Sequence, residues 1–106
     1  MFKTKTSQLE KIRNLNLCAN DLDDITIVSQ MSALEVLSLS VNSISTLKDI
    51  GYCHNLKELY IRRNNVESLQ EIDYLANLNN LRIMWMAENP VATLPNYRAH
   101  VIKTLP

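Results

Sequence analysis

The sequence predicts an α/β solenoid, with four short parallel strands on a concave face and 3₁₀ turns or short helices on the convex face. Three observations predict it. One pattern of apolar residues returns about every 22 residues, and an asparagine stands at the same place in each copy. The chain of 106 residues also contains twelve asparagines but one glycine, Gly51. Repeats of this length each form one strand and one return segment, and stacking buries a continuous core.

The repeats begin at Ile12, Leu34, Leu56 and Leu81, so successive starts lie 22, 22 and 25 residues apart. Each copy has the form LxxLxLxxNxL, as in "IRNLNLCANDL", "LEVLSLSVNSI", "LKELYIRRNNV" and "LRIMWMAENPV". The apolar positions are Ile12, Leu15, Leu17 and Leu22; Leu34, Leu37, Leu39 and Ile44; Leu56, Leu59, Ile61 and Val66; and Leu81, Met84, Met86 and Val91. This is the leucine-rich-repeat signature, because period, apolar grid and asparagine column agree independently.

The asparagine column consists of Asn20, Asn42, Asn64 and Asn89. Each follows a predicted strand, at the point where the chain turns and buried backbone groups need hydrogen-bond partners. Because an asparagine side chain both donates and accepts, we expect a ladder that bridges each coil to the next. Asparagine also tolerates left-handed backbone, so we expect these residues to make the turns that glycine makes elsewhere.

Between the strands, apolar residues recur at intervals of three, which predicts 3₁₀ turns or short helices on the convex side. The three series are Leu22, Ile25, Val28 and Met31; Leu47, Ile50 and Cys53; and Leu69, Ile72, Leu75 and Leu78. The third repeat is three residues longer than the first two, and we expect this insertion to add one such turn.

Both ends of a solenoid expose core and need caps. At the N-terminal end, Ser7 and Glu10 predict a capping box that opens a short helix, with Leu9 and Ile12 closing the first coil. At the C-terminal end, Pro95 predicts the first turn of a lid helix. The apolar face of that helix consists of Tyr97, Val101 and Leu105.

We expect one domain, with caps at residues 1–11 and 94–106 and repeats at residues 12–33, 34–55, 56–80 and 81–93. The end of the chain resembles the cap that follows the last repeat in several intracellular leucine-rich-repeat proteins; in that family the cap continues into a further apolar segment, so the resemblance implies that the chain is a piece of a longer protein.

The outward residues of the predicted strands line the concave face. They are small and neutral in the first two repeats, but aromatic and charged in the last two. Tryptophan, tyrosine and arginine dominate interface hot spots, which predicts a protein-binding surface. Its residues are Tyr60, Arg62, Arg63, Trp85, Glu58, Glu88, Ser38 and Ser40. In the alternative interpretation, Trp85 shields the exposed end of the sheet against the lid helix.

Other chemistry has little support in the sequence. Eleven basic and eleven acidic residues cancel, and Arg62 and Arg63 lie close to acidic residues, so we expect no direct binding of nucleic acid or membranes. A single glycine excludes phosphate-cradling loops. We therefore expect no enzyme, catalytic residue, cofactor or metal site.

Individual residues agree with that expectation. The acidic cluster Asp21, Asp23 and Asp24 lacks the glycine and terminal glutamate of a calcium loop. His54 and His100 have no cysteine or carboxylate at ligand spacing, which favours surface histidines. Two cysteines, Cys18 and Cys53, are too few for a disulfide framework, and the start of the chain lacks a secretory signal, so we expect a cytoplasmic protein.

The repeats resemble the N-terminal domain of the cilia- and flagella-associated protein 410 family, a family of basal-body leucine-rich-repeat proteins. The resemblance covers about residues 7–106 and includes "LEVLSLSVNSISTL", "LKELYIRRNNVESL" and "LRIMWMAENP". Its informative positions are the outward residues Ser40, Val41, Ser43, Tyr60, Arg62, Arg63, Trp85, Ala87 and Glu88. The end of the chain is similar to the YRxxVIxxLP cap of intracellular relatives through Tyr97, Arg98, Val101, Ile102, Leu105 and Pro106.

The resemblance implies a non-enzymatic scaffold at the ciliary base, needed for assembly or maintenance of cilia or flagella. It implies a cytoskeletal location at the basal body, and a NIMA-related kinase partner that binds a region outside this chain. We expect the domain itself to be monomeric, although the full-length protein can oligomerise. Two alternatives remain: a spliceosomal U2-particle leucine-rich-repeat protein that binds an RNA-binding protein, and an adaptor like axonemal dynein light chain.

Overall fold

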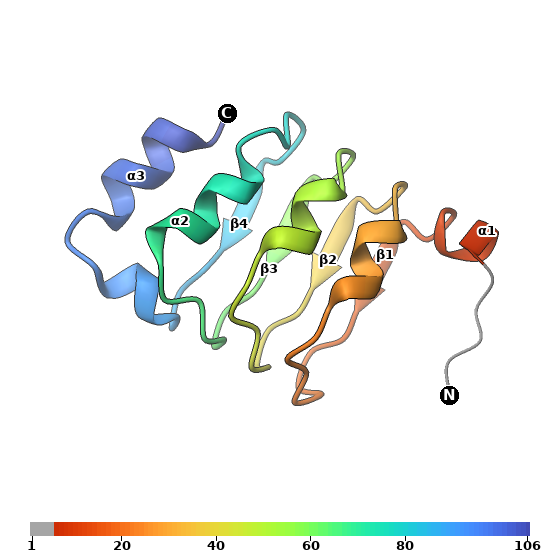
Figure 1. The fold of residues 1–106 in the computed structure, drawn as a ribbon, viewed down its shortest axis with the longest axis horizontal. Coiled ribbons are helices and arrows are strands. Elements are labelled where there is room, and N and C mark those ends of the chain that lie inside the picture. The colour runs from red at the N-terminus through yellow and green to blue at the C-terminus, as the bar shows by residue number, and fades with distance from the viewer. Residues whose placement is uncertain (1–5) are drawn as a thin grey trace.

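A computed structural model gives the structure of the chain and describes residues 6–106 (Figure 1). Four strands form one parallel sheet in the order β1-β2-β3-β4. Their bounds are β1 Asn14–Asn16, β2 Val36–Ser38, β3 Glu58–Tyr60 and β4 Ile83–Trp85. Sequential strands are therefore spatial neighbours, as stacking of one repeat on the next requires.

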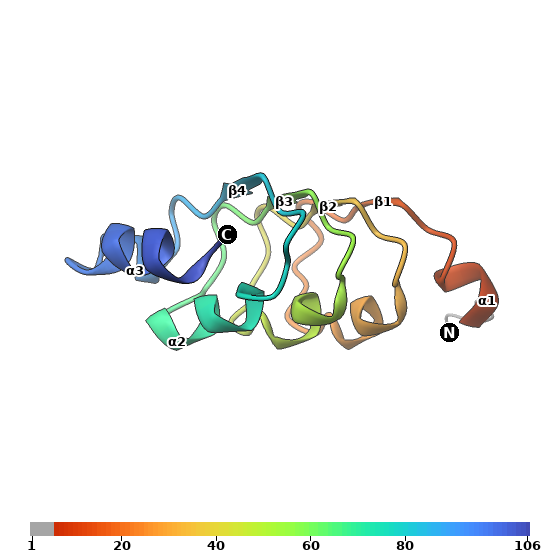
Figure 2. The same cartoon turned by 90° about the horizontal axis from the view of Figure 1, so that it is seen from above.

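Short helices return the chain from each strand to the next. They are η1 Thr26–Gln30, η2 Lys48–Tyr52, and α2 Leu69–Ile72 with its continuation η3 Asp73–Leu75, whereas η4 Pro90–Thr93 follows the last strand and leads to the C-terminal helix. Seen from above, the strands form one layer and the return helices a second, with α1 Thr6–Leu9 and α3 Tyr97–Thr104 at opposite ends (Figure 2). The longest return segment belongs to the third repeat, as its three extra residues predict.

The observed architecture confirms the predicted fold class. The core is built from the inward residues of the strands and the convex apolar series. Leu37 and Leu59 are fully buried, whereas Leu15 and Met84 are only partly buried. The reason is that β1 and β4 each have one neighbouring strand while β2 and β3 have two.

The side chain of Asn64 joins two neighbouring coils. Its Nδ2 donates to the carbonyl of Leu39 in the preceding coil at 3.0 Å, and to the carbonyls of Ile61 and Arg62 in its own coil. Its Oδ1 accepts from the backbone N–H of Ile44 at 3.0 Å. Asn64 is only 4% exposed, so these bonds satisfy buried backbone groups.

Asn42 and Asn89 make equivalent contacts, whereas Asn20 does not. Asn89 donates to Ile61 O at 2.8 Å and accepts from the N–H of Val66. Asn20 is exposed, and its side chain donates only to Cys18 O, in its own turn. No coil precedes β1 within residues 6–106, so Asn20 has no second coil to bridge.

The left-handed turns lie one residue earlier than the sequence predicts. Positive φ angles occur at the residue before each column asparagine, not at the asparagine itself. These residues are Ala19 (φ 59°), Val41 (φ 62°), Arg63 (φ 54°) and Glu88 (φ 64°), and Asp21 (φ 56°) also has one. The asparagine side chain is committed to inward hydrogen bonds, so the preceding residue, whose side chain faces solvent, makes the turn. Val41 is the most strained of them, since β-branched residues rarely adopt this conformation.

The caps agree with the sequence in part. Leu9 is buried and Ile12 packs against the core, whereas the side chain of Ser7, half of the predicted capping box, lies outside the described residues. The prediction that Pro95 opens the lid helix is wrong, because α3 begins at Tyr97. Leu94 has extended backbone, which is expected of a residue before proline and keeps the helix from starting there. The predicted apolar face of the lid does pack against the core.

Candidate partner-binding surface

The sheet register places the outward residues in straight columns across the concave face. Asn16 pairs with Ser38, Ser38 with Tyr60, and Tyr60 with Trp85. Ser38, Ser40, Tyr60 and Trp85 line one hollow of about 400 Å³, together with Arg62, Arg63 and Glu88. The structure therefore brings together seven of the eight residues that the sequence predicts for partner binding. The eighth, Glu58, contacts Tyr60 from the same strand.

Tyr60 and Trp85 form the aromatic centre of this surface. Their ring centroids are 4.9 Å apart and their planes meet at 89°, an edge-to-face contact. Tyr60 Oη donates to Glu58 Oε1 at 2.6 Å, and this hydrogen bond raises the pKa of Tyr60. Trp85 remains 53% exposed, so the lid helix does not bury it. The indole is thus held in place on one side and open to solvent on the other.

Arg62 and Arg63 share one carboxylate across the strands. Arg62 Nη2 lies 2.6 Å from Glu88 Oε1, and Arg63 Nε lies 2.6 Å from Glu88 Oε2. Hydrogen bonds from Arg63 and Arg62 hold the pKa of Glu88 below its usual value, so this carboxylate stays ionised near neutral pH. The cluster orders two arginines beside the aromatic pair, although one carboxylate neutralises only one of them.

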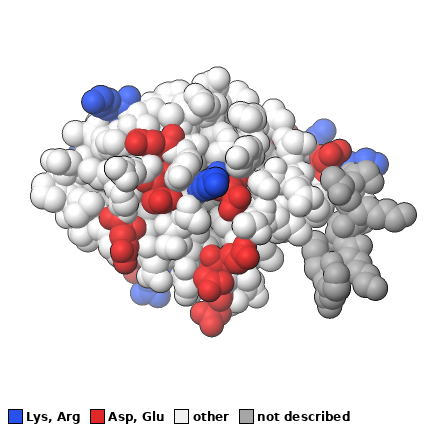
Figure 3. Space-filling model, viewed as in Figure 1, with Lys and Arg blue, Asp and Glu red and all other residues white. Residues whose placement is uncertain are grey.

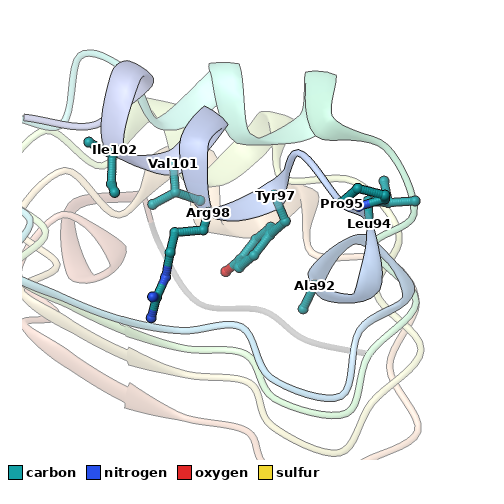
Figure 4. A pocket seen from close by; sticks show the side chains of 7 residues that line it. All are labelled: Ala92, Leu94, Pro95, Tyr97, Arg98, Val101 and Ile102. Carbon is teal, nitrogen blue, oxygen red and sulfur yellow. The ribbon is translucent and has the colours of Figure 1, made fainter.

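Two further hollows extend from the aromatic pair toward the lid, and sequence reasoning missed them as a site. The first, of about 550 Å³, lies between Trp85 and Tyr97 and is lined mainly by apolar side chains. The second, of about 480 Å³, lies between η4 and α3 (Figure 4). Tyr97 and Arg98 project from the start of α3 on the side that faces Ala92. The sequence did contain a signal for this site, because Ile102 is an apolar residue outside the predicted apolar face of the helix. In the structure Ile102 is 73% exposed.

The convex face differs in charge from the concave one. Figure 3 looks onto the helices and shows several groups of acidic side chains with few basic ones between them. Acidic residues of the convex segments include Asp49, Glu71 and Asp73. The hollow around Trp85 is instead lined by two arginines and one glutamate, with Glu58 beside it, bonded to Tyr60.

The structure gives His100 a carboxylate partner that lies far from it in the sequence. Its Nε2 lies 2.8 Å from Asp73 Oδ1, although 27 residues separate them in sequence. This pair ties the lid helix to the third return segment, a contact that spacing along the chain could not reveal. No group of three or more His, Cys, Asp or Glu residues in the described chain could hold a metal ion.

Cys53 has a structural role in the core. It is fully buried, and its Sγ lies 3.4 Å from Val28 O. Burial, together with the charge of Asp49, raises the pKa of Cys53 to about 11, so the thiol stays protonated. Cys18 is partly exposed in the polar end of the concave hollow. In the acidic cluster, Asp24 Oδ1 accepts from the N–H of Thr26 at 2.9 Å, which lowers the pKa of Asp24.

No helix within residues 6–106 is long and apolar enough to cross a bilayer.

Comparison with solved structures finds similar chains in bacterial and eukaryotic proteins. An internalin of Listeria monocytogenes, inlF, is 27% identical with a TM-score of 0.75, over 84% of this chain and 27% of that chain. Internalin C2 of the same species is 30% identical with a TM-score of 0.71, over 89% of this chain and 44% of that one. A chain of the Drosophila melanogaster SNF/U2A′ complex is 25% identical with a TM-score of 0.77, over 100% of this chain and 62% of that one.

The chain therefore spans less than two thirds of each of these proteins. Comparison with curated protein sequences gives no match. The model of the leucine-rich repeat family matches residues 4–106, nearly the whole chain. The four strands, the return helices and this match agree, and the chain belongs to the leucine-rich repeat family.

Proposed function

We propose that this domain is the partner-binding part of a non-enzymatic scaffold at the basal body or ciliary base, needed to assemble or maintain cilia or flagella. Domains of the leucine-rich repeat family bind protein partners. One of the similar solved structures is itself a complex, that of SNF with U2A′. The observation that carries the concave-face assignment is Trp85, which is held edge-on by Tyr60 and is still 53% exposed. A pre-ordered, half-open tryptophan beside arginine is typical of an interface hot spot.

The ciliary assignment rests on the outward residues of the strands. Inward residues are common to all such repeats, whereas Tyr60, Arg62, Arg63, Trp85 and Glu88 are free to vary, and these resemble the basal-body family. The proposal includes a cytoplasmic, cytoskeletal location. A NIMA-related kinase would bind the full-length protein through a region outside residues 1–106.

A second candidate function is that of a spliceosomal U2-particle protein that binds an RNA-binding protein. The similarity to a chain of the SNF/U2A′ complex over 100% of this chain favours it. The two candidates differ in location, because the first acts at the ciliary base and the second in the nucleus.

The test is imaging of the tagged full-length protein in ciliated cells, with a double variant, Trp85→Ala with Arg62→Ala, beside it. We expect the wild-type protein at the basal body and loss of both localisation and partner recovery in the variant. The matched control is Tyr52→Ala with Lys48→Ala, which removes an equally exposed aromatic residue (53%) and a cation from the convex helix η2.

Thermal unfolding of the purified variants checks that each is folded. A double variant that localises and binds its partners like wild type would contradict the assignment of partner binding to the concave face. Wild-type protein confined to the nucleus would favour the second candidate.

A further inference from the structure

Three hollows lie in a row and share their boundary residues. The polar concave hollow and the apolar one beside it share Arg62 and Trp85. The apolar hollow and the lid hollow share Ala92 and Tyr97. Together they form one groove that begins over β1 and β2, crosses the aromatic pair and ends on the lid helix α3.

The groove is graded in polarity along its length. Small polar residues such as Ser38 and Ser40 line its first part. Met84 and Met86 line the middle, and Val101 and Ile102 line the lid end. A partner that fills it must present apolar side chains to the middle and the lid end, since those surfaces gain most from removal from water.

The charged side chains of the groove are unbalanced. The residues that line the three hollows include Arg62, Arg63 and Arg98 and one carboxylate, Glu88, and a second carboxylate, Glu58, lies beside them as the acceptor of the Tyr60 hydroxyl. Glu88 is already hydrogen-bonded to Arg62 and Arg63, and Arg98 makes no ion pair within residues 6–106. The chain as a whole has zero net charge, so this excess is a property of the groove and not of the protein. Complementary charge on the partner would steer its approach and fix its register.

From this geometry we infer that the groove binds an acidic amphipathic segment of a protein, with carboxylates beside Arg62, Arg63 and Arg98 and apolar residues over Trp85, Tyr97 and Ile102. The inference rests on the proposed function, because it names the chemistry of the partner for the same surface. It also extends that surface onto the lid, with Arg98 as a second anchor.

A protein segment fits this groove better than a nucleic acid does. Nucleic-acid surfaces combine a continuous basic stripe with stacking aromatics, and here Glu88 interrupts the arginines. Apart from Tyr97 and Arg98, the lid end is lined by aliphatic residues, which neither stack on bases nor pair with phosphates. A nucleic acid nevertheless belongs in the test as a competing ligand.

The experiment uses two synthetic peptides of about 18 residues, each roughly 27 Å long as a helix, compared with the 43 Å long axis of the domain. Both peptides have leucines on one face of the helix. All remaining positions are glutamate in one peptide and lysine in the other. Binding to the whole chain is followed by the emission and the indole N–H resonance of Trp85, the only tryptophan. A short single-stranded RNA is the third probe.

We expect the acidic peptide to bind roughly five-fold or more tightly than the basic one at low salt, with the preference shrinking as salt is added. Arg98→Glu should remove most of that preference. Lys48→Glu, the same charge change on the convex helix η2, should leave it within about two-fold of wild type.

Several results would overturn the inference: no response of Trp85 to the acidic peptide, equal affinity for both peptides, a preference for the basic peptide, or tighter binding of RNA. Equal effects of Arg98→Glu and Lys48→Glu would overturn the role of the lid end. If both peptides bind with equal affinity and still perturb the signals of Trp85, the proposed function of the concave face is not contradicted. That function fails separately, if Trp85→Ala with Arg62→Ala retains its partners in cells.

Discussion

Gly51 of η2 packs against the backbone of Tyr74 in η3, where two neighbouring return helices meet. A Cβ atom at Gly51 would lie 2.5 Å from the carbonyl oxygen of Tyr74. Gly51 does not have a positive φ, so the chain does not need glycine here for its backbone conformation. The only glycine of the sequence is required by the close approach of two coils.

Gly51→Ala should lower the free energy of unfolding by about 1–3 kcal/mol, because the new methyl group pushes the two return helices apart. Chemical denaturation of the purified domain measures this. The matched control is Ser29→Ala, at the equivalent place in the preceding return helix η1, where a side chain is already accommodated. If both variants unfold at the wild-type midpoint, the close contact does not limit stability.

Asn64→Ala should lower the free energy of unfolding by about 2–4 kcal/mol, since it leaves the buried N–H of Ile44 without a partner and removes one of the hydrogen bonds to the carbonyls of Leu39, Ile61 and Arg62. Asn20→Ala is the control. Its side chain is exposed and bonds only within its own turn, so the expected change is within about 0.5 kcal/mol. Equal effects of the two substitutions would show that bridging between coils is not what the column contributes.

Val41→Asn should raise the unfolding temperature. Valine at φ 62° is strained by roughly 1–2 kcal/mol, and asparagine adopts this conformation more readily. The side chain of Val41 is 47% exposed, so little apolar burial is lost. Val41→Ala is an intermediate case and should fall between the two in differential scanning calorimetry. A lower unfolding temperature for Val41→Asn would mean that contacts of the valine outweigh its strain.

Loss of the charge of Glu88 should appear as a pH-dependent loss of stability. Hydrogen bonds from Arg63 and Arg62 lower the pKa of Glu88 in the folded state below its ordinary value of 4.5. Between the two pKa values the unfolded state binds more protons, so stability falls as pH falls through this window and is fully present above it.

Glu88→Gln removes this contribution. The difference in unfolding temperature between wild type and Glu88→Gln should be present at neutral pH, shrink as the pH falls below 4.5, and disappear below the lowered pKa of Glu88 in the folded state. A gap of constant size at all pH values would mean that the ionised form of Glu88 contributes nothing.

Much of the site could be predicted from the sequence because the repeat is periodic. Once the leucine grid is in phase, the position of Trp85 relative to Tyr60 follows from counting residues, and the sheet register agrees. The same counting places Asn42, Asn64 and Asn89 at one edge of the stack. It could not show that Asn20 lacks a coil to bridge, because its motif is identical to the others.

The turn residues were harder to predict. Sequence preference assigns left-handed backbone to asparagine, yet the structure uses Val41 and Arg63. The hydrogen bonds of the asparagine side chains fix which residue turns, and local preference yields to them.

The sequence by itself determined the solenoid, the number of strands, the columns of the concave face and the convex apolar series, since each depends on a period that is visible in one dimension. Only the tertiary structure decided which residues of one repeat contact residues of the next repeat or of the lid helix. Glu88 reaches Arg62 and Arg63 from 26 and 25 residues away, His100 reaches Asp73, and Gly51 lies against Tyr74. These contacts depend on how tightly the coils stack and on the angle at which the lid helix packs on the last coil, and neither quantity is periodic in the sequence.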